Sequence, residues 1–243
     1  MMYKSRAVAI DAGKACYPEL SGKRVLVTGA ERSIGFSIAK AFARQQARLV
    51  LQAARLSAAH RISGNALRVF ECRPRNAGEI ERLTDAAVTA HAGLDISVSV
   101  TALPADWRET AAIDPERAAA EALTIPFLTG QRVAERMRLK NIRGTLITVA
   151  ILPPETRAGA VGRTLLRSAL ATLVRRQAED QADCGIRAYG IAVDPLVGPA
   201  NPWADDEDAP AVARTGRGRA VAEAALSLAR PQAAFLSGQT LTA

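Results

Sequence analysis

The fold is decided by residues 23–40, which read KRVLVTGAERSIGFSIAK. Residues 25–28 are apolar or β-branched and predict a buried strand, and residues 34–47 repeat apolar side chains at helical spacing. Gly29 and Gly35 stand in the turn between the two elements, with Ser33 where a middle glycine is expected. A strand, a glycine turn and the start of a helix form a layout that binds nucleotide phosphates.

The alternation of strands and helices continues along the chain. Further strands are predicted at residues 49–53, 67–72, 96–100, 144–150, 186–193 and, shortest, 233–236; further helices at 77–90, 115–139, 159–182 and 219–229. This order predicts one α/β domain, a Rossmann-like, doubly wound parallel sheet of about seven strands with helices on both faces. Residues 1–22 are expected to form an N-terminal extension and residues 23–243 the domain.

Composition excludes several classes of protein. The chain has 243 residues, of which 49% are hydrophobic, so it is not a disordered polymer. No apolar run approaches the roughly 18 residues of a membrane span, and no signal peptide is expected. Cys16, Cys72 and Cys184 are odd in number and widely spaced, which indicates free thiols in a reducing cytoplasm.

The net charge of +8 has three explanations: nucleic acid, an acidic protein partner, or an anionic ligand such as a CoA thioester. The arginines are scattered over predicted helices, without zinc-finger spacing or an RNA-binding aromatic motif. Solvated helix faces are therefore favoured and a nucleic-acid partner is not expected. An acidic partner subunit is the sharper alternative.

The glycine turn at residues 28–35 resembles that of the short-chain dehydrogenase/reductase family. Segments similar to family segments follow in the family's order, at residues 94–98, 127–137, 144–147, 168–170, 185–187 and 237–239. The resemblance implies a nicotinamide cofactor and four catalytic side chains: a proton-transferring Tyr, a Lys, a Ser and an Asn.

The cofactor positions depart from the family pattern. In the turn, Gly29 and Gly35 are kept, but Ser33 replaces the glycine closest to the pyrophosphate, and Glu31 adds a negative charge beside it. Ala53 stands where an acidic residue would hold the ribose of NAD. We expect no cofactor to be bound by this chain.

Two further cofactor segments also differ from the family. Residues 99–102 replace the family's Asn-Asn-Ala-Gly, and Val193 and Asp194 replace its Pro-Gly. Arg55, after the second strand, would favour an NADP phosphate if the site were used, but an exposed loop arginine is the favoured explanation.

All four catalytic positions hold other residues. By spacing, Arg163 takes the Tyr position, Arg167 the Lys position, Ile151 the Ser position and Ala122 the Asn position. Arginine stays protonated near neutral pH and does not replace a group that both gives and takes a proton. An alignment shifted by one residue offers no acid or base either, because it brings in Thr164, Ser168 and Ala150. Halohydrin dehalogenases, which have this fold, also place Arg at the Lys position. They keep the Ser and the Tyr, which this chain lacks, so their activity is not expected here.

Other polar residues have simple structural interpretations. His60 and His91 are expected in structural roles, and Cys184 in buried packing. Residues 205–208 read as a solvated acidic loop, with Trp203 beside it packing on a partner or closing the cleft. No metal site is predicted.

These losses predict a non-catalytic subunit of a hetero-oligomeric NAD-dependent dehydrogenase. The resemblance implies contacts with an active family member through helices 115–139 and 159–182 and the C-terminal segment. NAD and a 3-hydroxyacyl-CoA-type substrate would then bind in the partner. Two alternatives stay open: an NADP-dependent or cofactor-independent enzyme with atypical residues, and a small-ligand-binding or regulatory homo-oligomer.

Overall fold

The computed structural model describes residues 16–54, 66–103, 115–153, 157–194 and 216–243. In these residues seven strands form one parallel sheet in the order β3-β2-β1-β4-β5-β6-β7. The strands are β1 Arg24–Thr28, β2 Arg48–Ala53, β3 Arg68–Glu71, β4 Ile96–Ala102, β5 Thr145–Ile151, β6 Arg187–Val193 and β7 Thr240–Thr242. The strand order reverses between β1 and β4, as in doubly wound folds. The predicted fold class is confirmed.

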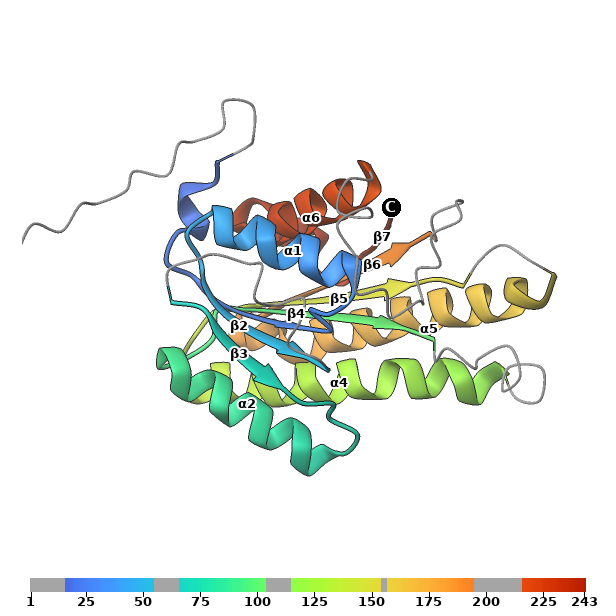
Figure 1. Cartoon of the computed structure of the whole chain (residues 1–243), viewed down its shortest axis with the longest axis horizontal. Coiled ribbons are helices and arrows are strands. Elements are labelled where there is room, and N and C mark those ends of the chain that lie inside the picture. Colours follow the sequence, from blue (N-terminus) through green and yellow to red (C-terminus); the bar gives the residue numbers. More distant parts are fainter. Residues whose placement is uncertain (1–15, 55–65, 104–114, 154–156, 195–215) are drawn as a thin grey trace, which may run out of the picture.

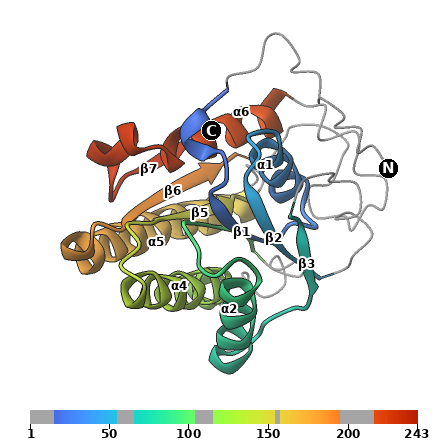
Figure 2. The same ribbon diagram turned by 90° about the vertical axis from the view of Figure 1, so that its left-hand side faces the viewer.

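Helices cover both faces of the sheet (Figures 1 and 2). One face carries α1 Ser33–Arg44 and α6 Gly216–Ala229, and the other carries α2 Ala77–His91, α4 Pro115–Leu139 and α5 Arg157–Gln181. Three short 3-10 helices complete the described chain: η1 Pro18–Leu20, η3 Ala182–Cys184 and η5 Pro231–Leu236. The helix predicted at residues 115–139 has the bounds of α4, with Pro126 inside it.

The strands in the middle of the sheet are almost continuously apolar because helices bury them from both sides. All seven residues of β5 are buried. On one face Phe42 of α1 packs in a cluster with Leu226 of α6. On the other face Met137 of α4 packs with Leu26 of β1. The well-packed sheet therefore holds in place the side chains and loops at the ends of its strands.

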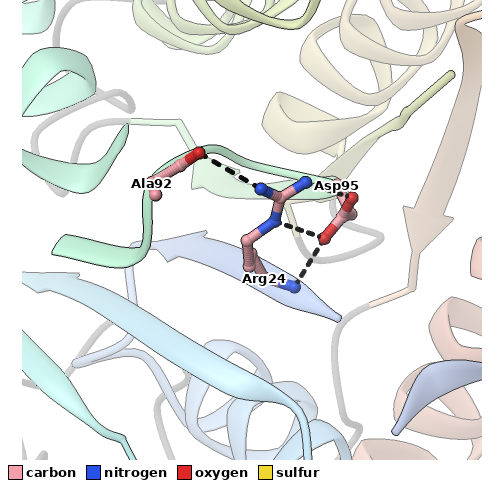
Figure 3. Close-up of polar contacts among 3 residues, drawn as sticks. All are labelled: Arg24, Ala92 and Asp95. Atoms are coloured by element: carbon pink, nitrogen blue, oxygen red, sulfur yellow. Dashed lines mark hydrogen bonds and ion pairs between the residues drawn. The ribbon is translucent and has the colours of Figure 1, made fainter. Parts of the chain in front are cut away.

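An ion pair joins two strands at the N-terminal edge of the sheet (Figure 3). Arg24 donates from Nε and Nη2 to the carboxylate oxygens of Asp95, at 2.7 Å each, and from Nη1 to Ala92 O at 3.2 Å. Ala92 is the left-handed residue that ends α2, with φ of 60°. Burial raises the pKa of Asp95, but the hydrogen bonds and charge of Arg24 outweigh it and hold this pKa below its usual value.

The N-terminal segment is tied to the end of α6. Glu19 accepts a hydrogen bond from Arg230 Nε at 2.5 Å, and the Arg230 guanidinium lies 4.3 Å from the centre of the Tyr17 ring. Leu20 is buried in the main core. Residues 17–20, which the sequence placed in the extension, therefore pack on the domain.

Two sequence predictions are wrong. Residues 233–236 do not form the last strand; they lie in η5, which Pro231 begins and where the hydroxyl of Tyr189 donates to Ala233 O at 2.7 Å. The last strand is β7, which pairs with β6 where Gly190 leaves room for Thr240. Cys184 is exposed instead of buried, because it lies in η3 at the surface.

Candidate functional site

The candidate site lies at the C-terminal edge of the parallel strands, near the point where strand order reverses. The described segments that meet there are the turn after β1, the ends of β2, β4 and β5, and Asp194 after β6. Several residues considered from sequence lie outside the described residues: Arg55, His60, Trp203 and residues 205–208.

Both glycines of the turn are required by the packing of the backbone. Gly29 has φ of 71°, and a Cβ there would overlap the carbonyl oxygen of Val100. A Cβ on Gly35 would overlap the carbonyl oxygen of Gly29. Ser33, in contrast, is the first residue of α1 and is half-buried. The fold alone therefore explains why Gly29 and Gly35 are present.

Two side chains of the protein occupy backbone donors around this turn. Gln52 accepts from Gly29 N at 3.0 Å and donates to Cys72 O at 2.5 Å, so it joins β1 to the end of β3. Glu31 Oε2 accepts from Ala54 N at 3.3 Å. The Glu31 carboxylate thus lies at the end of β2, beside the buried Ala53.

An arginine pair on α5 converges on one carboxylate. Arg163 donates from Nη1 to Pro153 O at 2.9 Å and from Nη2 to Asp194 Oδ1 at 2.6 Å. Arg167, one helical turn later, places its Nη2 3.5 Å from the same oxygen. The side chain of Arg163 is 15% exposed and that of Arg167 is 46% exposed.

The other expected catalytic positions are apolar and buried. Ala122 and Ile151 belong to the core, and Thr101 Oγ1 donates to Ala122 O at 2.7 Å. The alignment shifted by one residue does not supply an acid or base either. Ala150 is buried, Ser168 is exposed, and Thr164 Oγ1 donates to Ala160 O of its own helix. Within the described part of this edge, neither alignment supplies a side chain suited to proton transfer near neutral pH.

Among the described residues, Cys72 and His91 do not supply the missing proton-transfer group. Burial, with the charges of Glu79 and Glu31, raises the pKa of the Cys72 thiol, which disfavours the reactive thiolate. His91 is buried at the end of α2, where its Nε2 lies 3.2 Å from Leu49 O. No cluster of metal-ligating side chains occurs in the described residues.

Sequence reasoning missed the functional context of three polar residues. Asp194 was noted only as a departure from Pro-Gly, and Glu31 only as a charge near the turn. Gln52 is the one polar residue in the run LVLQA at 49–53, and a lone polar residue in a buried apolar strand is a usable signal. The structure brings Arg163 and Arg167 together with Asp194, and Glu31 to the end of β2.

A family model described as Enoyl-(Acyl carrier protein) reductase matches residues 29–243. The chain belongs to the short-chain dehydrogenase/reductase family. The resemblance found in the sequence is therefore confirmed.

Curated short-chain dehydrogenases match almost the whole chain. Glucose 1-dehydrogenase of Gluconobacter oxydans is 28% identical, with 91% of this chain and 90% of the relative covered. The 7alpha-hydroxysteroid dehydrogenase of Escherichia coli is also 28% identical, with 92% and 93% covered. These relatives are dehydrogenases, so this chain belongs to a family of oxidoreductases.

Solved family structures have the same fold. A hydroxysteroid dehydrogenase from Escherichia coli superposes with a TM-score of 0.70 at 25% identity, covering 92% of this chain and 94% of its own. A short-chain dehydrogenase/reductase variant from Serratia marcescens gives 0.73 at 25% identity, covering 93% and 98%. In the described residues, no helix has the length and apolar character needed to cross a membrane.

Proposed function

We propose that this chain is a non-catalytic subunit of a hetero-oligomeric, NAD-dependent short-chain dehydrogenase whose active site lies in its partner. The observation that carries the proposal is the ion pair between Arg163 and Asp194. It stands where the family resemblance expects the proton-transferring Tyr. Arginine side chains do not transfer protons near neutral pH, and this guanidinium is held by a carboxylate and by Pro153 O, so it does not take over the role of the Tyr.

The contacts around the turn between β1 and α1 support the proposal that this chain binds no dinucleotide. A pyrophosphate binds through free backbone N–H groups and a positive helix end. Here Gln52 already occupies the N–H of Gly29, and the Glu31 carboxylate lies at the end of β2, where a ribose would be bound. These residues do not fit a dinucleotide, and we place NAD in the partner subunit.

Exposed apolar side chains support the expected interfaces. Among the described residues, the large hydrophobic side chains that stand exposed are Leu139 at 71%, Val161 at 54% and Phe235 at 82%. They lie on α4, on α5 and on η5, near the C-terminus. These are the elements through which a partner is expected to dock.

The proposed reaction is the oxidation of a 3-hydroxyacyl-CoA-type substrate in the partner. The pattern of losses resembles the inactive subunit of heteromeric 2-(hydroxybenzyl)succinyl-CoA dehydrogenase, which acts in anaerobic toluene degradation on 2-(hydroxyphenylmethyl)succinyl-CoA. A chain with a net charge of +8 would suit a more acidic active subunit. We place the complex in the cytoplasm.

The test is to co-express the chain with a neighbouring-gene family member that keeps an intact Tyr-x-x-x-Lys, and to measure co-purification and turnover. We expect one stable complex whose activity depends on the partner's Tyr. The chain alone should give no nicotinamide fluorescence change with NADH or NADPH, with the active subunit as positive control. Micromolar binding by the chain alone, or a stable homotetramer of it, would contradict the proposal and favour one of the two alternatives.

A further inference from the structure

The cluster at the start of α5 has more positive than negative charge. Arg163 and Arg167 both face Asp194, so two guanidinium groups share one carboxylate. Arginine is charged at any physiological pH. Within the residues that the structure describes, one positive charge of the cluster is therefore not compensated by Asp194.

The two arginines differ in how they are held. Arg163 is largely buried and bonded to two acceptors at 2.9 and 2.6 Å. Arg167 is half-exposed, and its 3.5 Å approach to Asp194 Oδ1 is longer than a good charge-assisted hydrogen bond. The flat guanidinium of Arg167 is thus positioned by the cluster without being saturated by it.

We propose that Arg167, supported by Arg163, binds the carboxylate of a small-molecule ligand at this edge of the sheet. The protein already places one carboxylate oxygen, Oδ1 of Asp194, against both guanidinium groups, which shows that the pair can hold a carboxylate between them. A planar carboxylate matches the two parallel N–H groups of a guanidinium. A ligand with one negative charge also matches the one positive charge that Asp194 leaves uncompensated. The Asp194 carboxylate would compete with this ligand for Arg167.

This inference does not depend on the proposed function, because a catalytic or a non-catalytic chain would bind the anion in the same way. The test uses the full-length chain, alone or in its complex. Sodium benzoate is titrated by calorimetry at constant ionic strength, with benzamide as the uncharged analogue. We expect saturable binding of benzoate and none of benzamide.

Three variants identify the site. Arg167→Gln should weaken benzoate binding by at least about tenfold, because the charge and the two-point contact are lost. Asp194→Asn should tighten it several-fold, because the competing charge is removed while the side-chain shape is kept. Arg175→Gln, an exposed arginine further along α5, should leave the affinity unchanged.

Equal weakening by Arg167→Gln and Arg175→Gln would mean general attraction to a basic surface and would overturn the proposal. So would weaker binding in Asp194→Asn, provided that its thermal unfolding is unchanged. These readouts measure benzoate affinity, whereas the proposed function fails on nicotinamide binding or on turnover, so the two failures are distinguishable.

Discussion

Arg163 is a largely buried cation whose charge is compensated inside the fold. Its two partners, Pro153 O and Asp194, come from the ends of β5 and β6. Removing one member of a buried ion pair leaves the other charge without a counter-charge, which destabilises more than the pair stabilises. The ion pair with Asp194 therefore offsets the free-energy cost of burying the charge of Arg163 at the edge of the sheet.

We predict that Asp194→Ala lowers the free energy of unfolding by about 2–3 kcal/mol. The double variant Arg163→Met with Asp194→Ala should lose clearly less than the sum of the single changes, because it leaves no unpaired charge. Urea unfolding measures all four corners of this cycle. Arg176→Met, which breaks an exposed pair with Asp180, is the control and should change stability by under about 0.5 kcal/mol. Additive effects at Arg163 and Asp194 would contradict the interpretation.

Asp95 makes a second residue-level prediction, on pH dependence. Its pKa is lowered in the folded protein, so the unfolded chain binds a proton at higher pH than the folded one. The stability that Asp95 contributes is present above its unfolded pKa of about 3.9 and is lost as pH falls through the lower folded pKa. Urea unfolding across acidic pH should show Asp95→Asn to have a flatter acid limb than the native chain. An unchanged limb would mean that Arg24 does not hold this carboxylate.

Local spacing predicts which residues stand at the family's catalytic positions, but it does not predict what they contact. Arg163 and Asp194 are 31 positions apart, and Gln52 lies 23 positions from Gly29. The register of the sheet determines which of these distant residues come into contact, and a local sequence pattern does not predict that register. This is why the ion pair between Arg163 and Asp194 could not be predicted from the sequence.

At the scale of elements, the glycines in the turn from β1 into α1 are required by the packing of the fold, whether or not a nucleotide binds there. Gly35→Ala should destabilise the protein by about 1–3 kcal/mol, because its Cβ meets the carbonyl oxygen of Gly29. Gly78→Ala in α2 is the matched control: a Cβ there meets only Asn76 Oδ1, at 3.6 Å, and should stabilise by up to about 1 kcal/mol. Thermal unfolding distinguishes the two. Equal effects would mean that Gly35 is not required by packing.

Long elements with clear periodicity were predicted from sequence, whereas the two short elements after α6, η5 and β7, were not. The bounds of α4 followed from its helical spacing, and β5 and β6 from their continuous apolar runs. Residues 233–236 are also apolar, but four residues carry too little periodicity to separate a strand from a 3-10 helix. Contacts with residues far along the chain determine the outcome: Tyr189 donates to Ala233 O in the middle of η5, and Gly190 leaves room for Thr240 of β7.

At the scale of the whole molecule, assembly should depend on apolar side chains that do little for the isolated fold. Phe235→Ser should change the free energy of unfolding of the chain by under about 0.5 kcal/mol, since its side chain is 82% exposed. If η5 contacts the proposed partner, the change should weaken association by about tenfold or more, because an aromatic side chain that the interface would bury is lost. Analytical ultracentrifugation of the complex measures this, with the exposed neighbour Gln232→Ser as control. Unaltered association would remove η5 from the interface.

The hydrogen bonds of Gln52 and Glu31 around the nucleotide turn have a consequence for the lifetime of the protein. A dehydrogenase that binds its coenzyme gains stability from it, in proportion to the logarithm of coenzyme concentration over Kd. In this chain Gln52 and Glu31 accept hydrogen bonds from backbone donors around the turn. If, as proposed, the chain binds no dinucleotide, its resistance to unfolding should not depend on the cell's supply of coenzyme, and a shortage of coenzyme would destabilise the proposed active partner first.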